Sequence, residues 1–176
     1  MRTQAPERAD TSAPITTSHD DTVASTPSLI HLKNILLPLD FSEKSLKSLQ
    51  YAIPFAQQFG AKLTLLHVAQ PVDYTVDFTN IVSLGSDHFA ALEKQLEDIR
   101  ATKIPSDLTV DIVVRHNFVF DGVVEVARQI RADLIITTTH GYTGLKHLMM
   151  GSTAENIVRR APCPVLVVRE FEHDFV

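Results

Sequence analysis

The feature that most constrains the fold is a regular alternation of short apolar runs with amphipathic stretches. The apolar runs cover residues 34–38, 62–68, 108–115, 133–137 and 165–168. Their near-continuous Val, Ile and Leu content is typical of buried strands. Between them, apolar residues recur at helical spacing, as in the stretch from Leu46 to Ala56. The predicted order is βαβαβαβαβ, which favours an α/β fold with a parallel sheet covered by helices on both faces.

Local signals predict where several helices begin and end. Ser42 is the expected N-cap of the first helix, and Gly60 is expected to end it. Pro54 lies inside that helix, where its missing donor and its ring predict a kink or an interruption in the last turn. Asp121 is the expected cap of a later helix, and the last helix is predicted from Ser152 onward.

Length, charge and cysteine content narrow the function classes. The chain has 176 residues, which suit one domain with a proper core. The net charge is −5, from 16 Lys and Arg against 21 Asp and Glu, and no run of five like charges occurs. This balance argues against nucleic acid as the main partner. Cys163 is the single cysteine, and its place beside an apolar strand predicts a buried thiol in a reducing compartment.

The first 29 residues differ in composition from the rest of the chain. They hold Ser, Thr, Pro, Ala and charged residues with almost no large apolar side chain. Such a segment buries too little surface to offset its ordering entropy, which predicts a disordered tail. No apolar run approaches the length of a membrane span, and the amino terminus lacks a secretory core. We therefore expect a soluble, cytoplasmic protein without a membrane partner.

A glycine-punctuated loop joins the fourth strand to the last helix, within the sequence TTTHGYTGLKHLMMGSTAENIVRR. Glycines such as Gly141 and Gly151 let backbone N–H groups approach an anion without an intervening Cβ. Ser152 follows directly, and its spacing from Glu155 is that of a capping box. Two interpretations stay open at this point. The helix start holds a phosphate, or the glycines permit a turn and Ser152 caps the helix.

Polar residues follow two of the predicted strands. Asp40 comes after the first strand, and His140 and Gly141 come after the fourth. Parallel sheets bind ligands beyond the carboxyl ends of their strands, where the strand order reverses. If these two strands are neighbours, the residues face one nucleotide-sized crevice. Asp40 is alternatively a turn residue, His140 alternatively braces the loop, and His67 is interpreted as a hydrogen-bonded core histidine.

Four segments resemble the universal stress protein family, of the adenine-nucleotide α-hydrolase-like superfamily. They read NILLPLDFSEKSLKSLQYA, LTLLHV, ADLIITTTHG and HLMMGSTAENIVRRAPCPVLVVR, and the likeness extends from about residue 33 to 169. The resemblance implies a Rossmann-like, five-stranded parallel sheet in the order 3-2-1-4-5, an ATP site, and a homodimer through the last strand. It also implies one family domain over residues 30–170, with tails at 1–29 and 171–176.

The family's nucleotide signature is G-x2-G-x9-G followed by Ser or Thr. In this chain the pattern falls on Thr138, Gly141, Gly151 and Ser152. Thr138 departs from it and brings a branched Cβ, and a hydroxyl, where a ligand approaches the backbone. By the same resemblance, three sets of residues line the adenine and ribose, the sugar and phosphates, and the phosphate chain. The adenine and ribose are flanked by Pro38, Asp40 and Val68. The sugar and phosphates are lined by Thr137, His140 and Gly141. The phosphate chain is held by Gly151, Ser152, Thr153 and Ala154.

Motifs for dedicated catalysis are missing from the sequence. It contains no G-x-x-x-x-G-K-[ST], G-x-G-x-x-G, H-E-x-x-H, C-x-x-C or G-x-S-x-G. We expect no catalytic residue, no protein-held metal, and at most slow ATP hydrolysis, with Mg²⁺ arriving through the phosphates. The leading hypothesis is an ATP-binding dimeric stress-response regulator that pairs through Val165–Val168. The alternative is an interaction module of the same family that binds no nucleotide and acts through its dimer and an unidentified protein partner.

Overall fold

The computed structural model describes residues 30–71, 81–139 and 151–169, so both predicted tails lie outside the described residues. Its sheet has five strands, all parallel, in the order β3-β2-β1-β4-β5. The strands are β1 (Asn34–Pro38), β2 (Lys62–Ala69), β3 (Val110–His116), β4 (Leu134–Thr138) and β5 (Val165–Val168). The helices are α1 (Glu43–Lys47), α2 (Leu49–Phe59), α3 (Ile81–Lys103), α4 (Val119–Gln129) and α5 (Ser152–Arg160). The predicted fold class and strand order are confirmed.

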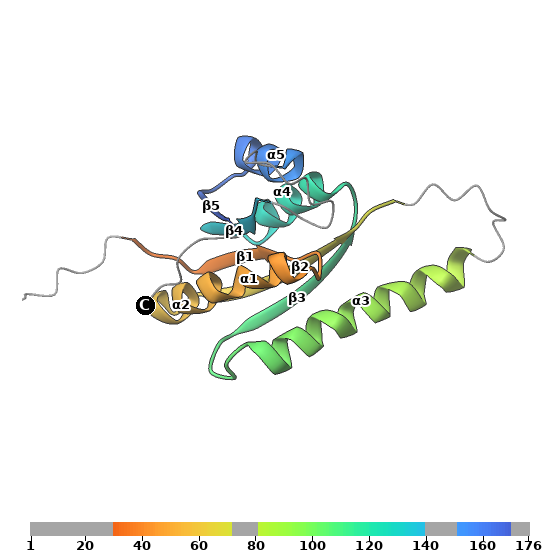
Figure 1. Cartoon of the computed structure of the whole chain (residues 1–176), viewed down its shortest axis with the longest axis horizontal. Helices are drawn as coiled ribbons and strands as arrows, with labels where there is room; N and C mark the ends of the chain where they lie inside the picture. Colours follow the sequence, from red (N-terminus) through yellow and green to blue (C-terminus); the bar gives the residue numbers. More distant parts are fainter. Residues whose placement is uncertain (1–29, 72–80, 140–150, 170–176) are drawn as a thin grey trace, which may run out of the picture.

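The helices form a layer on each face of the sheet. Figure 1 shows α4 and α5 together on one side and α3 along the other. Side chains of β1 alternate between the two layers. Leu37 packs in the core beneath α2 and α3, and Leu36 packs in the core beneath α4 and α5. Both residues are fully buried, as expected for a strand that is covered on both faces.

β1 is the central strand, and its two ladders differ in length. It pairs with β2 over its whole length, but with β4 only at Ile35–Leu134 and Leu36–Ile135. The order of the strands reverses between β1 and β4, because β2 and β3 extend to one side and β5 to the other. The switch point of the sheet lies between these two strands, and the β1–β4 ladder ends before their carboxyl ends.

Asp133 ties the opposite ends of β1 and β4 together. Its Oδ2 atom accepts hydrogen bonds from the backbone N–H of Lys33 at 2.7 Å and of Asn34 at 2.9 Å. Charge-assisted bonds of this kind are stronger than neutral ones. The two strands are thus held at their amino ends.

The predicted helix boundaries are confirmed in part. Ser42 caps α1, since its Oγ accepts from the backbone N–H of Ser45 at 3.1 Å, and Gly60 ends α2 with φ of 62°. The interruption falls at Ser48, between α1 and α2, and not at Pro54. Pro54 is exposed, and α2 continues past it to Phe59. The predicted interruption at Pro54 was wrong, because a proline that faces solvent removes one donor and leaves the later turns helical; the predicted kink stays a prediction.

The start of α4 also differs from expectation. Its N-cap is Phe118, which makes no side-chain capping bond, and Asp121 lies in the first turn of the helix. An acidic residue in that turn still complements the helix dipole. The helix then packs close to the sheet at Gly122, where an added Cβ would lie 2.9 Å from Cγ1 of Val68. Glycine at this position lets α4 approach the end of β2.

Two further sequence expectations concern the surface and the thiol. Within the described ranges, no helix is both long and apolar enough to cross a membrane. Cys163 is half-buried and packs against the core beneath α4 and α5, so it is less enclosed than expected. Burial raises the pKa of its thiol, and the carboxylate of Asp133 raises this pKa further. The thiol is therefore held in its protonated form.

Candidate functional site

The site predicted from sequence lies at the carboxyl ends of β1, β2 and β4 and at the start of α5. Pro38 is the last residue of β1, and Asp40 lies in the turn between β1 and α1. Val68 is next to last in β2, and Thr137 holds the same place in β4. His140 and Gly141 lie outside the described residues. The remaining predicted residues, from Gly151 to Ala154, form the N-cap and first turn of α5.

Asp40 is part of a hydrogen-bonded turn. Its Oδ1 atom accepts from the backbone N–H of Ser42 at 3.0 Å and from the Ser42 hydroxyl at 2.5 Å. The backbone N–H of Asp40 in turn donates to Oγ of Ser45 at 3.3 Å. This is the turn role that the sequence left open for Asp40. It fixes the carboxyl group at the end of β1, next to the switch point, and the ligand role stays a prediction.

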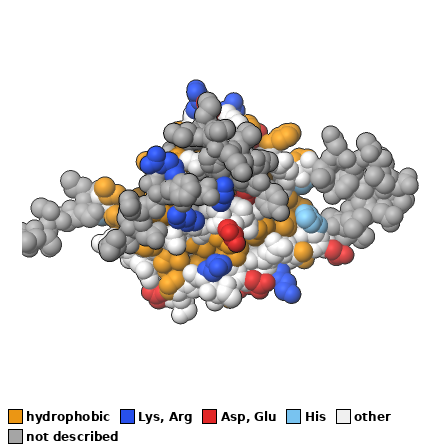
Figure 2. Space-filling model, in the orientation of Figure 1, with side chains coloured by type: hydrophobic (Ala, Val, Ile, Leu, Met, Phe, Trp, Pro, Cys, Tyr) orange, Lys and Arg blue, Asp and Glu red, His pale blue; other side chains and the backbone are white. Residues whose placement is uncertain are grey.

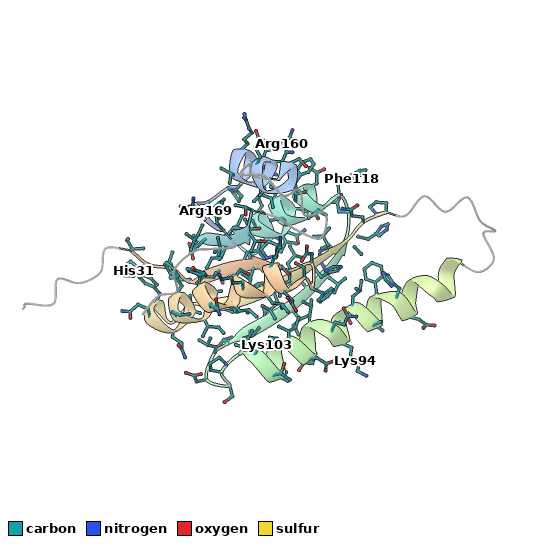
Figure 3. All side chains as sticks on the ribbon, in the orientation of Figure 1. His31, Lys94, Lys103, Phe118, Arg160 and Arg169 are labelled. Carbon is teal, nitrogen blue, oxygen red and sulfur yellow. The ribbon has the colours of Figure 1, made fainter. Side chains whose placement is uncertain are left out.

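Val68 supplies an apolar surface at the end of β2. Its side chain is 8% exposed and contacts Gly122 of α4. The backbone N–H of Asn117 donates to the carbonyl oxygen of Ala69 at 3.1 Å, which fastens the turn before α4 to the same strand end. Figure 3 places Phe118 at the beginning of α4, and its side chain is 63% exposed. This corner of the sheet is apolar, as an adenine-binding surface requires.

Thr137 and Thr138 project to opposite faces of the sheet. Ile135 packs in the core beneath α4 and α5, and Ile136 packs in the core beneath α2 and α3. Because side chains alternate along a strand, Thr137 faces the α4–α5 side and Thr138 faces the α1–α2 side. Thr137 therefore shares a face with Val68. Thr138 does not, although it occupies the first position of the nucleotide signature.

A shallow hollow of about 210 Å³ lies on the α1 side. It is lined by Glu43, Lys44, Lys47, Thr138, Thr139, Val168 and Arg169. Figure 2 shows Lys and Arg side chains, in blue, on this face beside α1. Of the predicted site residues, the hollow includes only Thr138. It is therefore separate from the face of the sheet that Val68 and Thr137 share.

The start of α5 lies against the end of β4. Gly151 is the N-cap, and its backbone N–H donates to the carbonyl oxygen of Thr139 at 2.9 Å. A Cβ on Gly151 would lie 3.0 Å from that oxygen, so close backbone contact explains the glycine. The capping box predicted for Ser152 and Glu155 was wrong. Ser152 is the first residue within the helix. The N-cap is Gly151, which has no side chain to make a capping bond.

The corrected cap changes the chemistry of this helix start. Glu155 forms an exposed ion pair with Arg159 at 2.9 Å instead of reaching back to the cap. The first N–H groups of a helix have no partner within the helix, and the N-cap here is a glycine, which has no side chain to accept from them. Ser152 and Thr153 are exposed, and Ala154 is buried beneath them. This arrangement presents backbone donors and the positive end of a helix dipole, which together suit an anion.

α5 is also held in place from its other end. The guanidinium of Arg160 lies 5.0 Å from the centre of the Phe120 ring on α4, and Figure 3 labels this arginine. Ile157 is 2% exposed and packs in the core beneath the two helices. The helix start therefore belongs to a packed element of the fold.

His67 has a role that the sequence indicated only in part. Its Nδ1 atom lies 2.8 Å from the carbonyl oxygen of Leu39, which confirms the expected hydrogen bond, although His67 is half-buried and lies at the border of the core. Its ring also stacks on Phe41 at 4.3 Å between centroids. Burial lowers the pKa of His67 below its usual range, against opposing effects of the Leu39 carbonyl and the Asp40 carboxylate. Nothing in the sequence indicated the contact with Phe41.

Metal binding by protein side chains finds no support in the described ranges. No group of three or more His, Cys, Asp or Glu residues there has the geometry to hold a metal ion. Structural metal sites use four protein ligands and catalytic ones usually three.

Comparisons with known proteins agree with the fold. The model of the Universal stress protein family matches residues 31–169. A universal stress protein of Methanocaldococcus jannaschii is 33% identical, over 78% of this chain and 82% of that protein. Universal stress protein A homolog 1 of Coxiella burnetii is 34% identical, over 79% and 97% of the two chains. The structure of UspA from Lactobacillus plantarum gives a TM-score of 0.65 at 25% identity, over 80% and 99%. The chain belongs to the universal stress protein family.

Proposed function

We propose that the chain binds an adenine nucleotide, ATP by expectation, in the crevice between β1 and β4. The base and ribose lie against Val68 and Asp40, and the phosphates lie at the start of α5. Nucleotide occupancy would then alter a dimer or partner surface in a stress response. No residue in the proposal acts as a catalyst, and Mg²⁺ enters with the phosphates.

The observation that carries the proposal is the start of α5. Its N-cap is a glycine without a capping side chain, and the Gly151 amide is bonded to the end of β4 at 2.9 Å. The helix donors therefore lie beside the carboxyl end of β4, one of the two strands that flank the switch point, where parallel α/β folds bind ligands. A helix start in that place favours phosphate over a neutral ligand.

Thr138 does not stand in the way of this ligand. Its side chain lines the hollow on the α1 side, whereas Val68 and Thr137 face the α4–α5 side. The branched Cβ that replaces the first glycine of the signature thus points away from the proposed base and phosphate positions. We expect Thr138→Gly to change ATP affinity less than threefold, which is below about 1 kcal/mol.

Other universal stress proteins with this fold have been solved with adenine nucleotides. One is a complex with cAMP at 21% identity, and one from Archaeoglobus fulgidus is a complex with dAMP at 15% identity. At these identities the likeness establishes the fold alone. The proposal for this chain therefore depends on its own residues, above all on those at the start of α5.

The placement of two titratable side chains among the described residues supports a binding role without catalysis. Asp40 accepts two hydrogen bonds from Ser42, and these stabilise its carboxylate in the turn. His67 contacts Leu39 and Phe41, which belong to the α1–α3 side of the sheet. A general base needs hydrogen-bond reach to the water that it activates. We propose a binding protein whose ATP turnover is slow at most.

Substitution of Ser152 tests the phosphate position. Ser152→Pro removes the first helical N–H. The backbone accommodates proline here, because proline is favoured at the first position of a helix and the preceding residue, Gly151, is extended with ψ of 149°. Ser152→Ala is the matched control, since it removes the hydroxyl and keeps the N–H. Calorimetry should show that Ser152→Pro weakens ATP by roughly tenfold or more, for loss of a charge-assisted bond. The affinity of Ser152→Pro for adenosine should stay within about twofold of the wild-type value.

The second candidate is the interaction module that binds no nucleotide. Two observations favour it, because Asp40 has a structural role in its turn and Gly151 is explained by contact with Thr139. Both Gly151 and the Asp40 carboxylate are then explained by contacts within the protein, without a ligand. Wild-type protein that binds neither ATP nor adenosine would replace our proposal with this one. Equal losses of both ligands in Ser152→Pro would place the phosphates elsewhere.

A further inference from the structure

His67 contacts the residues on both sides of Asp40. Its ring nitrogen Nδ1 lies 2.8 Å from the carbonyl oxygen of Leu39, the residue before Asp40. Its ring plane stacks at 4.3 Å, with an angle of 25°, on Phe41, the residue after Asp40. Because a carbonyl oxygen accepts, Nδ1 carries the proton in this contact. One side chain of β2 thus holds the turn that begins at the end of β1.

The backbone held in this way is strained. Phe41 has φ of 64°, in the left-handed region that favours glycine. A bulky residue adopts this conformation only where the surrounding structure enforces it. The Phe41 ring stacks on His67 and also packs against the core beneath α2 and α3. A relaxed φ at Phe41 would rotate the peptide between Asp40 and Phe41.

The orientation of Asp40 depends on the same turn. Its Oδ1 atom is bonded to the N–H and the hydroxyl of Ser42, one residue beyond Phe41. The Ser42 hydroxyl oxygen also accepts from the N–H of Ser45 at the start of α1. A change at Phe41 therefore reaches the Asp40 carboxyl group and the α1 cap together.

We propose that His67 is a positioning residue for the nucleotide site, which clamps Leu39 and Phe41 and so fixes where the Asp40 carboxylate stands. The inference rests on the proposed function, because it assigns Asp40 to the ligand. His67 itself touches no ligand. It acts from the α1–α3 side of the sheet by enforcing the left-handed conformation of Phe41.

Three substitutions separate the parts of the clamp. His67→Phe keeps a ring to stack on Phe41 and removes the donor to Leu39. His67→Asn places an amide nitrogen at the same number of bonds from the backbone as Nδ1, so it restores the donor without the ring. His88→Asn is the control, because His88 lies on α3 near His67, is exposed, and makes neither contact.

A double-mutant cycle with Asp40 provides the decisive test. Calorimetry should show that His67→Phe weakens adenosine by roughly tenfold in the wild-type background, and by less than twofold when Asp40→Ala is already present. His67→Asn should recover most of the affinity, and His88→Asn should leave it unchanged. A merely structural role predicts equal losses in both backgrounds, and that result would overturn the proposal.

Hydrogen exchange tests the clamp without any nucleotide. The backbone amides of Ser42 and Ser45 donate to the turn bonds, which slow their hydrogen exchange. In His67→Phe these two amides should exchange at least tenfold faster than in the wild type. Unchanged exchange would contradict the clamp even if His67→Phe is less stable overall. Wild-type protein that fails to bind adenosine, together with faster exchange in His67→Phe, would reject the nucleotide site and retain the clamp.

Discussion

The backbone N–H of Gly151 donates to the carbonyl oxygen of Thr139 at 2.9 Å, so α5 begins directly against the end of β4. The bond joins two residues on either side of the glycine loop. It places the donors at the start of α5 beside the carboxyl end of β4, one of the two strands that flank the switch point. The stability and the binding chemistry of this contact lead to separate predictions.

Replacement of Gly151 tests the close contact itself. Gly151→Ala adds a Cβ at 3.0 Å from the Thr139 oxygen, a backbone atom that has little freedom to move. We expect the free energy of unfolding to fall by about 1 to 3 kcal/mol, as in other overpacked sites. Urea denaturation measures this change. Stability within a few tenths of the wild-type value would mean that the loop adjusts freely.

Two serines at helix starts should respond differently to truncation. Ser42 caps α1 through a 3.1 Å bond, so Ser42→Ala should lower the free energy of unfolding by about 0.5 to 2 kcal/mol. Ser152 lies inside α5 and caps nothing, so Ser152→Ala should cost less than about 0.5 kcal/mol. Chemical denaturation of both variants in parallel measures the difference. A larger loss in Ser152→Ala would restore the capping role that the structure removes.

The last strand predicts a dimer contact. β5 pairs with β4 on one side and is at the end of the strand order. Ile135 donates to the carbonyl oxygen of Pro164, so alternation turns the backbones of Val165 and Val167 toward the open edge. Such an edge invites a second strand, and pairing with a symmetry mate would close it.

We expect wild-type protein to be a dimer by light scattering, and Val167→Pro to be a monomer. Proline removes an edge donor that the β4 ladder does not use. Val165→Thr keeps the donor and serves as the control. A wild-type monomer at tens of micromolar would refute the prediction, as would an unchanged mass in Val167→Pro.

The pKa of His67 predicts a pH dependence of stability. Burial lowers this pKa in the folded state below the usual value of about 6.5, so the unfolded chain binds the proton more readily. Its contribution to stability is complete above the unfolded pKa and is lost as the pH falls through that value toward the folded pKa. The Leu39 carbonyl and the Asp40 carboxylate oppose this shift and raise the pKa, whereas His88 adds to the lowering.

Urea melts between about pH 7.5 and pH 5.5 should therefore show falling stability in the wild type and a shallower fall in His67→Asn. His88→Asn removes only the smaller lowering effect on the pKa of His67, so its slope should lie between those of wild type and His67→Asn. An identical slope in wild type and His67→Asn would show that His67 does not titrate differently on folding.

Much of the fold is predictable from the sequence, because each strand is a compact apolar run bounded by polar or turn residues. The five predicted strands all occur, with ends that shift by one or two residues, such as Leu108 to Val110 at the start of β3. The strand order came from the family resemblance, since buried parallel strands carry no mark of their neighbours. β1 and β4 meet across almost 100 residues of chain, as Ile35 and Leu134 show.

The errors in the site arise where a local pattern competes with tertiary contacts. The spacing of Ser152 and Glu155 suits a capping box, but Gly151, which contacts Thr139, is the cap, although the helix itself begins at Ser152 as predicted. Phe41 carries no local tendency to positive φ, so the sequence indicated neither its left-handed conformation nor its stack with His67. The face of the sheet toward which Thr138 projects could be predicted from the sequence, because side chains alternate along the strand and Thr138 lies two residues after Ile136.

Calorimetric titration of ATP with Mg²⁺ into the purified wild-type chain tests the central claim most directly. We predict a dissociation constant in the micromolar range, on the order of −8 kcal/mol, with one nucleotide per chain. Adenosine should bind more weakly, because it lacks the phosphates that the start of α5 is proposed to hold. No heat and no shift in melting temperature at millimolar ATP would contradict the nucleotide site and leave the interaction module as the function of this chain.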